Sequence, residues 1–193
     1  MGTPDRGESE LLALVERSVR AHYGVEPARA SVTFVGVEPI EILRFDTAVE
    51  CVHVSLGMSR QPMTGADAIA LAASGPRAEL SIRSRGGERE LWRRLAILAA
   101  APTVEGVVYR DGMTVDLGEP LVPGSRCTGV LVGPSTLEPV TVADIEVQIL
   151  ALDAVTATEI AWSRVHGTAA LRERWTGQQI DLLDLRRAPV RLD

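Results

Sequence analysis

The stretch from Thr141 to Leu152 has the clearest hydrophobic pattern in the chain. Ile145, Val147 and Ile149 alternate with polar residues, so an extended segment here would have one apolar face. From Ile149 onward both faces are apolar, which predicts a strand that begins half covered and ends buried. We therefore expect this strand to form the centre of the fold.

The residues after this strand predict a helix. Thr156 is followed three residues later by Glu159, the spacing of a capping box, in which each side chain bonds the backbone N–H of the other residue. Gly167 marks a break, and a further helical stretch is expected over Thr168–Trp175. A short strand or an extended tail is expected over Gln179–Leu185.

Two more helices and several strands are predicted from the same patterns. Apolar residues at four-residue spacing predict a helix over Glu8–Tyr23 and another over Glu88–Ala101, with Pro102 just beyond its end. Alternation predicts strands over Ser31–Val37, Ile40–Phe45, Val49–Ser59 and Arg77–Ser84. Turn residues divide the segment Val104–Gly133 into short strands, so hairpins are expected there.

The connection from Gly57 to Pro76 is the longest predicted loop. It has glycine near both ends, and its alanine-rich middle is compatible with a helical turn. In the strand that follows, the aliphatic residues face inward and Glu79, Ser81 and Arg83 face outward.

Together these elements predict one α+β domain over residues 1–193, with a mixed, largely antiparallel sheet flanked by helices. A chain of 193 residues is long enough to bury a substantial core without disulfides. Aromatic residues make up only 4% of the chain, so the core should be aliphatic. Residues 1–7 are expected to form a disordered tail.

Composition excludes several classes of function. All twenty basic residues are arginine, so no lysine can form a Schiff base or hold a phosphate in a P-loop. The net charge of -6, with no basic run, argues against nucleic acid and anionic membranes as partners. We find no export signal and no apolar run long enough to span a bilayer, which predicts a cytoplasmic protein.

One strand face carries residues that could support chemistry. Cys51, His53 and Ser55 share this face, as in a Cys-His nucleophile pair or half of a metal site, with Cys127 and His166 as conceivable partners. Such lone groups are more often structural, and no CxxC or HExxH motif accompanies them. We predict no catalytic residue, metal or cofactor, and keep a small enzyme or ligand-binding protein using this face as the alternative.

Several stretches, taken in order, resemble the suppressor of fused (Sufu-like) domain family as it occurs in bacteria. They are VHVSLGMSRQPM (Val52–Met63), AELSIRS (Ala78–Ser84), LWRRLAILA (Leu91–Ala99), GVLVGP (Gly129–Pro134), IEVQILALDAVTATEIAWSRVHGTAAL (Ile145–Leu171) and LLDLRR (Leu182–Arg187). The chain departs from the family at Ala154 and Val155, where relatives usually have Pro-Leu, and at Leu56, where they usually have an aromatic residue.

The resemblance implies a mixed sheet flanked by helices that binds other polypeptides and has no known catalytic residues. Eukaryotic relatives hold a transcription-factor peptide as an added strand between two lobes, and this chain is long enough only for the first lobe. Bacterial relatives are proposed to be immunity proteins that neutralise toxins, and an acidic chain would suit a basic toxin surface.

We therefore expect a non-enzymatic protein-binding module, and the resemblance to bacterial relatives implies that it is of the immunity type. Such a module would bury a partner's surface or accept its strand at a sheet edge. The first candidate contact residues are Arg60, Gln61 and Met63, because exposed arginine and methionine suit adaptable interfaces. An ordinary solvent-exposed loop explains the same three residues. A third reading is a subunit that self-associates through exposed patches. The sequence leaves the partner and the oligomeric state open.

Overall fold

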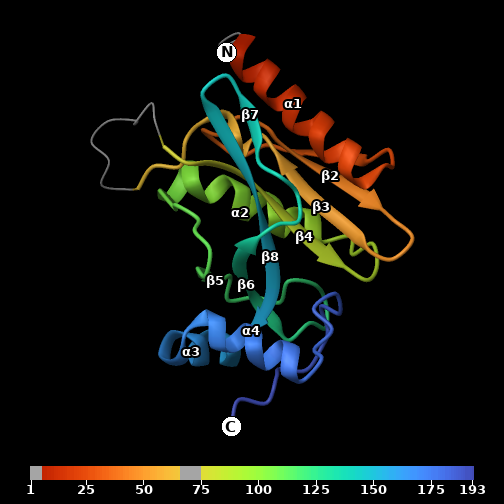
Figure 1. Ribbon diagram of the computed structural model, residues 1–193, viewed down its shortest axis with the longest axis vertical. Helices are drawn as coiled ribbons and strands as arrows, with labels where there is room; N and C mark the ends of the chain where they lie inside the picture. Colours follow the sequence, from red (N-terminus) through yellow and green to blue (C-terminus); the bar gives the residue numbers. More distant parts are fainter. Residues whose placement is uncertain (1–5, 66–74) are drawn as a thin grey trace.

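Four α-helices and eight strands make up the part of the chain that the computed structural model describes, residues 6–65 and 75–193 (Figure 1). The helices are α1 (Arg6–Tyr23), α2 (Leu91–Glu105), α3 (Ala157–His166) and α4 (Thr168–Gly177), with a short 3-10 turn η1 (Met58–Arg60). The strands are β1 (Ala28–Val32), β2 (Ile40–Asp46), β3 (Cys51–Leu56), β4 (Arg77–Ser84), β5 (Thr114–Asp116), β6 (Cys127–Pro134), β7 (Val140–Val142) and β8 (Ile145–Thr156).

All eight strands belong to one mixed sheet, which confirms the predicted α+β class. The strand order is β1-β2-β3-β4-β8-β6-β5, and β7 pairs with β8. Among the described strands only β4 and β8 run parallel to each other. β1 and β5 lie at the two ends of this order, and β7 also has a free edge because it pairs only with β8 among the described strands.

β8 lies at the centre of the sheet, as predicted, and runs along the long axis of the molecule (Figure 1). It pairs with β4 on one side, and with β6 and β7 on the other. The predicted strand from Thr141 contains a hairpin instead, because Ala143 adopts a φ of 51° in the turn between β7 and β8. That turn reverses the chain inside a segment whose side chains alternate like one strand.

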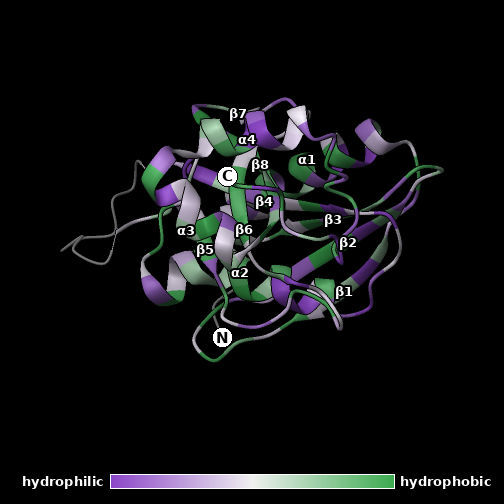
Figure 2. Ribbon diagram, turned by 90° about the horizontal axis from the view of Figure 1, so that it is seen from below, coloured by the Kyte–Doolittle hydropathy of each residue, from purple (hydrophilic) through white to green (hydrophobic). Residues whose placement is uncertain are grey.

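The helices cover both faces of the sheet, and hydrophobic residues gather on the strands between them (Figure 2). Leu11 and Val15 of α1 pack on one face, and Leu95 and Leu98 of α2 pack on the opposite face. α3 and α4 cover the far end of the α1 face, where Trp175 is buried. The core is therefore two layers of aliphatic side chains separated by the sheet.

α2 does not end where the sequence predicts. It continues through Pro102 to Glu105. Proline has no N–H, so it leaves the carbonyl of Leu98, four residues earlier, without its helical donor. The hydroxyl of Tyr109 donates to this carbonyl over 2.7 Å. A side chain from beyond the helix thus replaces the missing bond and lets the helix pass the proline.

Other boundaries also differ from the prediction. The first strand is Ala28–Val32, earlier than Ser31–Val37, and residues 178–185 form turns with no strand. α1 begins at Arg6, so the last two of the seven residues expected in a tail are helical. Residues 1–5 and the alanine-rich middle of the loop, residues 66–74, lie outside the described residues.

The capping box predicted at the start of α3 is present and extends into a buried ion pair. The Glu159 N–H donates to the Thr156 hydroxyl, and the Thr156 N–H donates to the Glu159 carboxylate over 2.8 Å. The carboxylate also accepts from Arg187 at 2.7 and 2.9 Å, from the Val190 N–H at 3.0 Å and from the Trp175 indole at 3.2 Å. One fully buried glutamate thereby joins β8, α3, α4 and the C-terminal segment.

Two opposing effects act on the pKa of Glu159. Burial raises it, whereas the hydrogen bonds and charge of Arg187 and the amides of Thr156 and Val190 lower it. The lowering effects win, and the pKa lies below the ordinary value of 4.5. The ion pair therefore stabilises the fold above the pKa that the unfolded chain has, and this contribution is lost as the pH falls through the folded pKa.

We expect Tyr109→Phe to lower the free energy of unfolding by about 1–3 kcal/mol, because it leaves the buried Leu98 carbonyl without a donor. Urea unfolding followed by circular dichroism measures the difference. Tyr23→Phe is the matched control, since the Tyr23 hydroxyl forms no hydrogen bond with the described residues. Equal losses in the two variants would contradict the role given to Tyr109.

We expect Glu159→Gln to lower the free energy of unfolding by about 3–5 kcal/mol at pH 7, because Arg187 then loses the charge that compensates its burial. The wild type should lose stability on acidification below about pH 4.5, and the variant should lose much less. Urea titrations between pH 7 and pH 3 test both points. Glu119→Gln, in an exposed ion pair with Arg94, should change little.

Candidate functional site

A buried carboxylate holds the turn after β3. Glu79 of β4 is fully buried, so the prediction that it faces outward is wrong. It accepts hydrogen bonds from the Ser55 hydroxyl (2.5 Å), the Gly57 N–H (2.8 Å), and the N–H and hydroxyl of Ser59 (3.0 and 2.6 Å). These four donors replace the water that a carboxylate loses on burial. They also fix the direction of the loop that follows.

Two local features explain why this turn needs its sequence. Gly57 has a φ of 130°, and a Cβ there would lie 3.2 Å from the Pro39 carbonyl oxygen. Arg77 donates to the carbonyls of Ser59 and Arg60, which have no helical partners after so short a turn. The start of the long loop is therefore attached to β4 from two directions.

The three candidate contact residues lie in different environments. The Arg60 guanidinium donates to the Pro39 carbonyl over 2.7 Å and pairs with Glu38 at 3.6 Å, so it is held against the loop before β2. Gln61 is exposed. Met63 is only 4% exposed, and so is not the exposed side chain that its loop position predicts.

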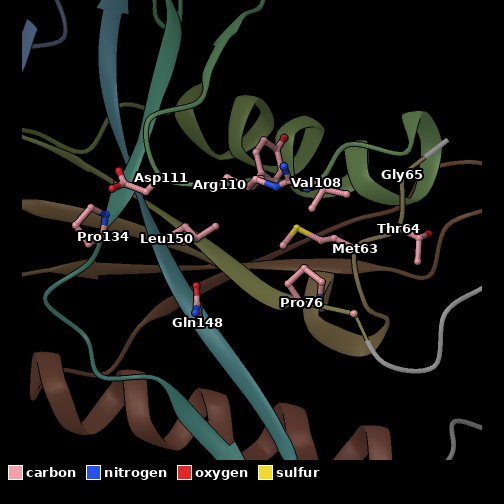
Figure 3. A pocket seen from close by; sticks show the side chains of 12 residues that line it. Met63, Thr64, Gly65, Pro76, Val108, Arg110, Asp111, Pro134, Gln148 and Leu150 are labelled. Atoms are coloured by element: carbon pink, nitrogen blue, oxygen red, sulfur yellow. The ribbon is translucent and has the colours of Figure 1, made fainter. Parts of the chain in front are cut away.

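Met63 instead forms one wall of an open cavity of about 660 Å³ on the α2 side of the sheet (Figure 3). The loop contributes Met63, Thr64, Gly65, Gly75 and Pro76, the segment after α2 contributes Val108, Tyr109, Arg110 and Asp111, and β6 and β8 contribute Pro134, Gln148 and Leu150. Most of the wall is apolar, and its polar side chains are those of Thr64, Arg110, Asp111 and Gln148, besides the Tyr109 hydroxyl.

Backbone pairing holds the walls of this cavity in place. The Met63 N–H donates to the Pro76 carbonyl over 2.8 Å and closes the base of the loop. The Gly112 N–H donates to the Val132 carbonyl over 3.0 Å and attaches the segment after α2 to β6. Alternation along β8 directs both Gln148 and Leu150 to the α2 side.

The cavity is suited to binding. Asp111 pairs with Arg172 at 3.0 Å, and the Tyr109 hydroxyl is occupied by Leu98, so neither is positioned as a free acid or base. Apolar walls with a few polar groups are typical of sites that accept an apolar side chain or a small ligand. Arg110 and Gln148 can orient what binds.

The alternative site, the Cys51 and His53 face, has the wrong protonation states for a nucleophile pair. The Sγ and Nδ1 atoms are 4.0 Å apart, and both residues are buried. Burial and a hydrogen bond with Asp46 raise the pKa of Cys51 to about 12, while burial and the charge of Arg44 lower the pKa of His53 to about 4. At neutral pH the thiol is protonated and the imidazole is neutral, so neither is activated.

The conceivable partners of this face are elsewhere. β4 and β8 separate β3 from β6, so strand spacing alone puts Cys51 and Cys127 at least about 14 Å apart. His166 stacks on Trp162 with ring centroids 4.3 Å apart, at the end of α3. Within residues 6–65 and 75–193, no group of three or more His, Cys, Asp or Glu side chains is arranged to hold a metal ion.

Most of the cavity could not be found from the sequence. Its walls come from segments far apart in the chain, and only the shared face of Gln148 and Leu150 is visible in the alternation of β8. Glu79 was missed because its strand alternates regularly, and the sequence gives no sign that β3 and β4 leave room for a carboxylate between them.

No helix in the described ranges is long and apolar enough to cross a membrane.

The family model for the Suppressor of fused protein (SUFU) matches residues 36–188, which is most of the chain. The protein therefore belongs to the suppressor of fused family. Comparison with curated proteins finds no match.

Solved structures of suppressor of fused proteins share the fold. A SUFU homologue from Neisseria gonorrhoeae FA 1090 is 19% identical with a TM-score of 0.72, and the match covers 94% of this chain and 97% of that one. The Sufu-Fu complex (14%, TM-score 0.63) is matched over 97% of this chain and 93% of that one. Drosophila Suppressor of Fused (14%, TM-score 0.64) is matched over 93% of this chain and 51% of that one, so this chain spans about half its length.

We expect Cys51 and Cys127 to be unreactive towards a thiol reagent such as dithionitrobenzoate in the native protein at pH 8, because burial raises the pKa of both thiols. Both should react in guanidinium chloride. Absorbance at 412 nm counts the thiols in each case. A native Cys51 that reacts within seconds would support the enzyme alternative.

Proposed function

We propose that this protein is a non-enzymatic binding module that captures a partner polypeptide at the cavity beside Met63. The observation that carries the proposal is an open cavity with apolar walls and fixed sides in a chain whose other candidate site has no activated group. Family membership supports it, since one solved relative is a complex of Sufu with Fu.

The walls suggest what the partner presents. Burying one aliphatic side chain against Pro76, Val108 and Leu150 would contribute about 1.5–3 kcal/mol. Arg110 and Gln148, at the polar part of the wall, can bond the partner's backbone or polar groups. A short partner segment with one large apolar residue fits this arrangement.

The candidate loop residues stay part of the proposal in different roles. Met63 shapes the cavity wall, and Gln61 lies exposed on the same loop. Arg60 is held by Pro39 and Glu38, so we assign it to fixing the loop next to the site.

The finer proposal is that the partner is a toxin and that the module is an immunity-type protein acting in the cytoplasm. It rests on the resemblance to bacterial relatives. The net charge of -6 suits a partner with a basic surface.

We expect Gln148→Trp to fill the cavity and to reduce partner retention at least tenfold, which corresponds to about 1.4 kcal/mol. Tagged wild type and variants are used to co-purify partners from the native cells, and each retained polypeptide is quantified by mass spectrometry. Thr141→Trp is the matched control, because Thr141 is exposed on neighbouring β7 outside the cavity. It should retain the partner as the wild type does.

A polypeptide that the Gln148→Trp variant retains fully would overturn the cavity assignment. The triple variant Arg60→Ala, Gln61→Ala, Met63→Ala tests the loop, and unchanged retention would exclude it from the interface. If the partner is a toxin, wild type should protect cells that express it and Gln148→Trp should not. A bound metabolite with no polypeptide would favour the ligand-binding alternative.

A further inference from the structure

The outer face of α2 carries an apolar stripe that no other described segment covers. Ile97 and Val104 are 42% and 60% exposed, and Ala101 lies between them. Spacings of four and three residues place the three side chains on one side of the helix. Val35 is also fully exposed. It precedes Gly36, which lines a hollow together with Ala99 and Thr103 of α2. We call Ile97, Ala101 and Val104 the α2 stripe.

Opposite charges lie at the two ends of the α2 stripe. Arg93 is exposed one turn before Ile97, and Glu105 is exposed directly after Val104. Neither forms an ion pair within the described residues, and the Arg93 guanidinium lies over the Trp92 ring at 5.2 Å.

This arrangement of charges opposes the helix dipole. A helix favours acids in its first turn and bases in its last turn, and α2 has neither. The positions of Arg93 and Glu105 therefore cost α2 some stability within a single chain. A second α2 helix running in the opposite direction would offset this loss of stability, because it would place an acid beside Arg93 and a base beside Glu105.

We propose that two copies of this chain associate through the α2 stripe, with the two α2 helices antiparallel. Positions 93 and 105 are equally far from Ala99, and so are positions 97 and 101. A twofold axis at the level of Ala99 therefore sets Arg93 against Glu105 of the second copy, twice, and Ile97 against Ala101 of the second copy. The two ion pairs lie about 18 Å apart along the helix, at the ends of the apolar contact.

The order of charges favours a second copy over other occupants. A uniformly acidic segment would suit Arg93 but would be repelled by Glu105, and a uniformly basic segment would meet the opposite problem. A surface with both charges in reverse order is available on the chain itself. The three side chains of the α2 stripe offer a smaller area than the about 800 Å² per partner that a stable interface buries. The dimer therefore forms only at high protein concentration.

Sedimentation velocity of the full chain over a range of concentrations tests this inference. The wild-type sedimentation coefficient should rise with concentration, whereas R93E and E105R should each stay monomeric, because each places like charges together at both ends. An equimolar mixture of R93E and E105R should associate, since every pair is then opposite again, and the double variant R93E/E105R should associate by itself.

Two controls separate this result from misfolding. R17E changes an exposed arginine of α1 that has no ion pair in the described residues, and it should leave association unchanged. R93E and E105R should each raise the thermal midpoint, because each agrees better with the α2 dipole. A wild type that stays monomeric at all concentrations, or a mixture that fails to associate, overturns the proposal. Neither outcome affects the cavity, which is tested by partner capture.

Discussion

The packing of α3, α4 and the C-terminal segment onto β8 depends on the buried ion pair between Glu159 and Arg187. Trp175 and Val190 bond the same carboxylate, and Arg187 also donates to the Ala154 carbonyl over 2.8 Å. A buried pair of charges adds little net stability compared with apolar residues of similar size, but an unpaired member is very costly. Misplacing the C-terminal segment would leave Glu159 unpaired, so the pair selects one arrangement of β8, α3 and α4.

Glu79 has a comparable role at the turn after β3, where it fixes the chain through different chemistry. It has no arginine among its hydrogen-bond partners, and its bonds come from two serine hydroxyls and two backbone N–H groups. Because three of these donors belong to the turn after β3, the carboxylate sets the course of the loop that reaches Met63. The cavity is thus a consequence of a buried polar network more than of its own apolar walls.

The two proposed contacts occupy different surfaces and use different physics. The cavity offers depth and apolar walls, which suit a single inserted side chain of another polypeptide. The α2 stripe is shallow and has charges in a self-complementary order, which suits a second copy of the chain. Both lie on the side of the sheet that α2 covers, whereas the residues first considered for chemistry, Cys51 and His53, are packed beneath that helix as uncharged groups.

The sequence by itself determined the class of fold, the central strand and the capping box of α3. Each depends on contacts between neighbours in the chain: alternation along β8, and the three-residue spacing from Thr156 to Glu159. The spacing of apolar residues likewise placed α1 and most of α2.

Only the tertiary structure decided the features that need distant partners. Pro102 lies inside α2 because Tyr109 folds back to the Leu98 carbonyl, and Glu79 points inward because a turn from another strand supplies its donors. The cavity joins residues from Met63 to Leu150 that share no local pattern. Local spacing records which face of an element is apolar, but it cannot record which other segment satisfies a buried polar group or closes a wall.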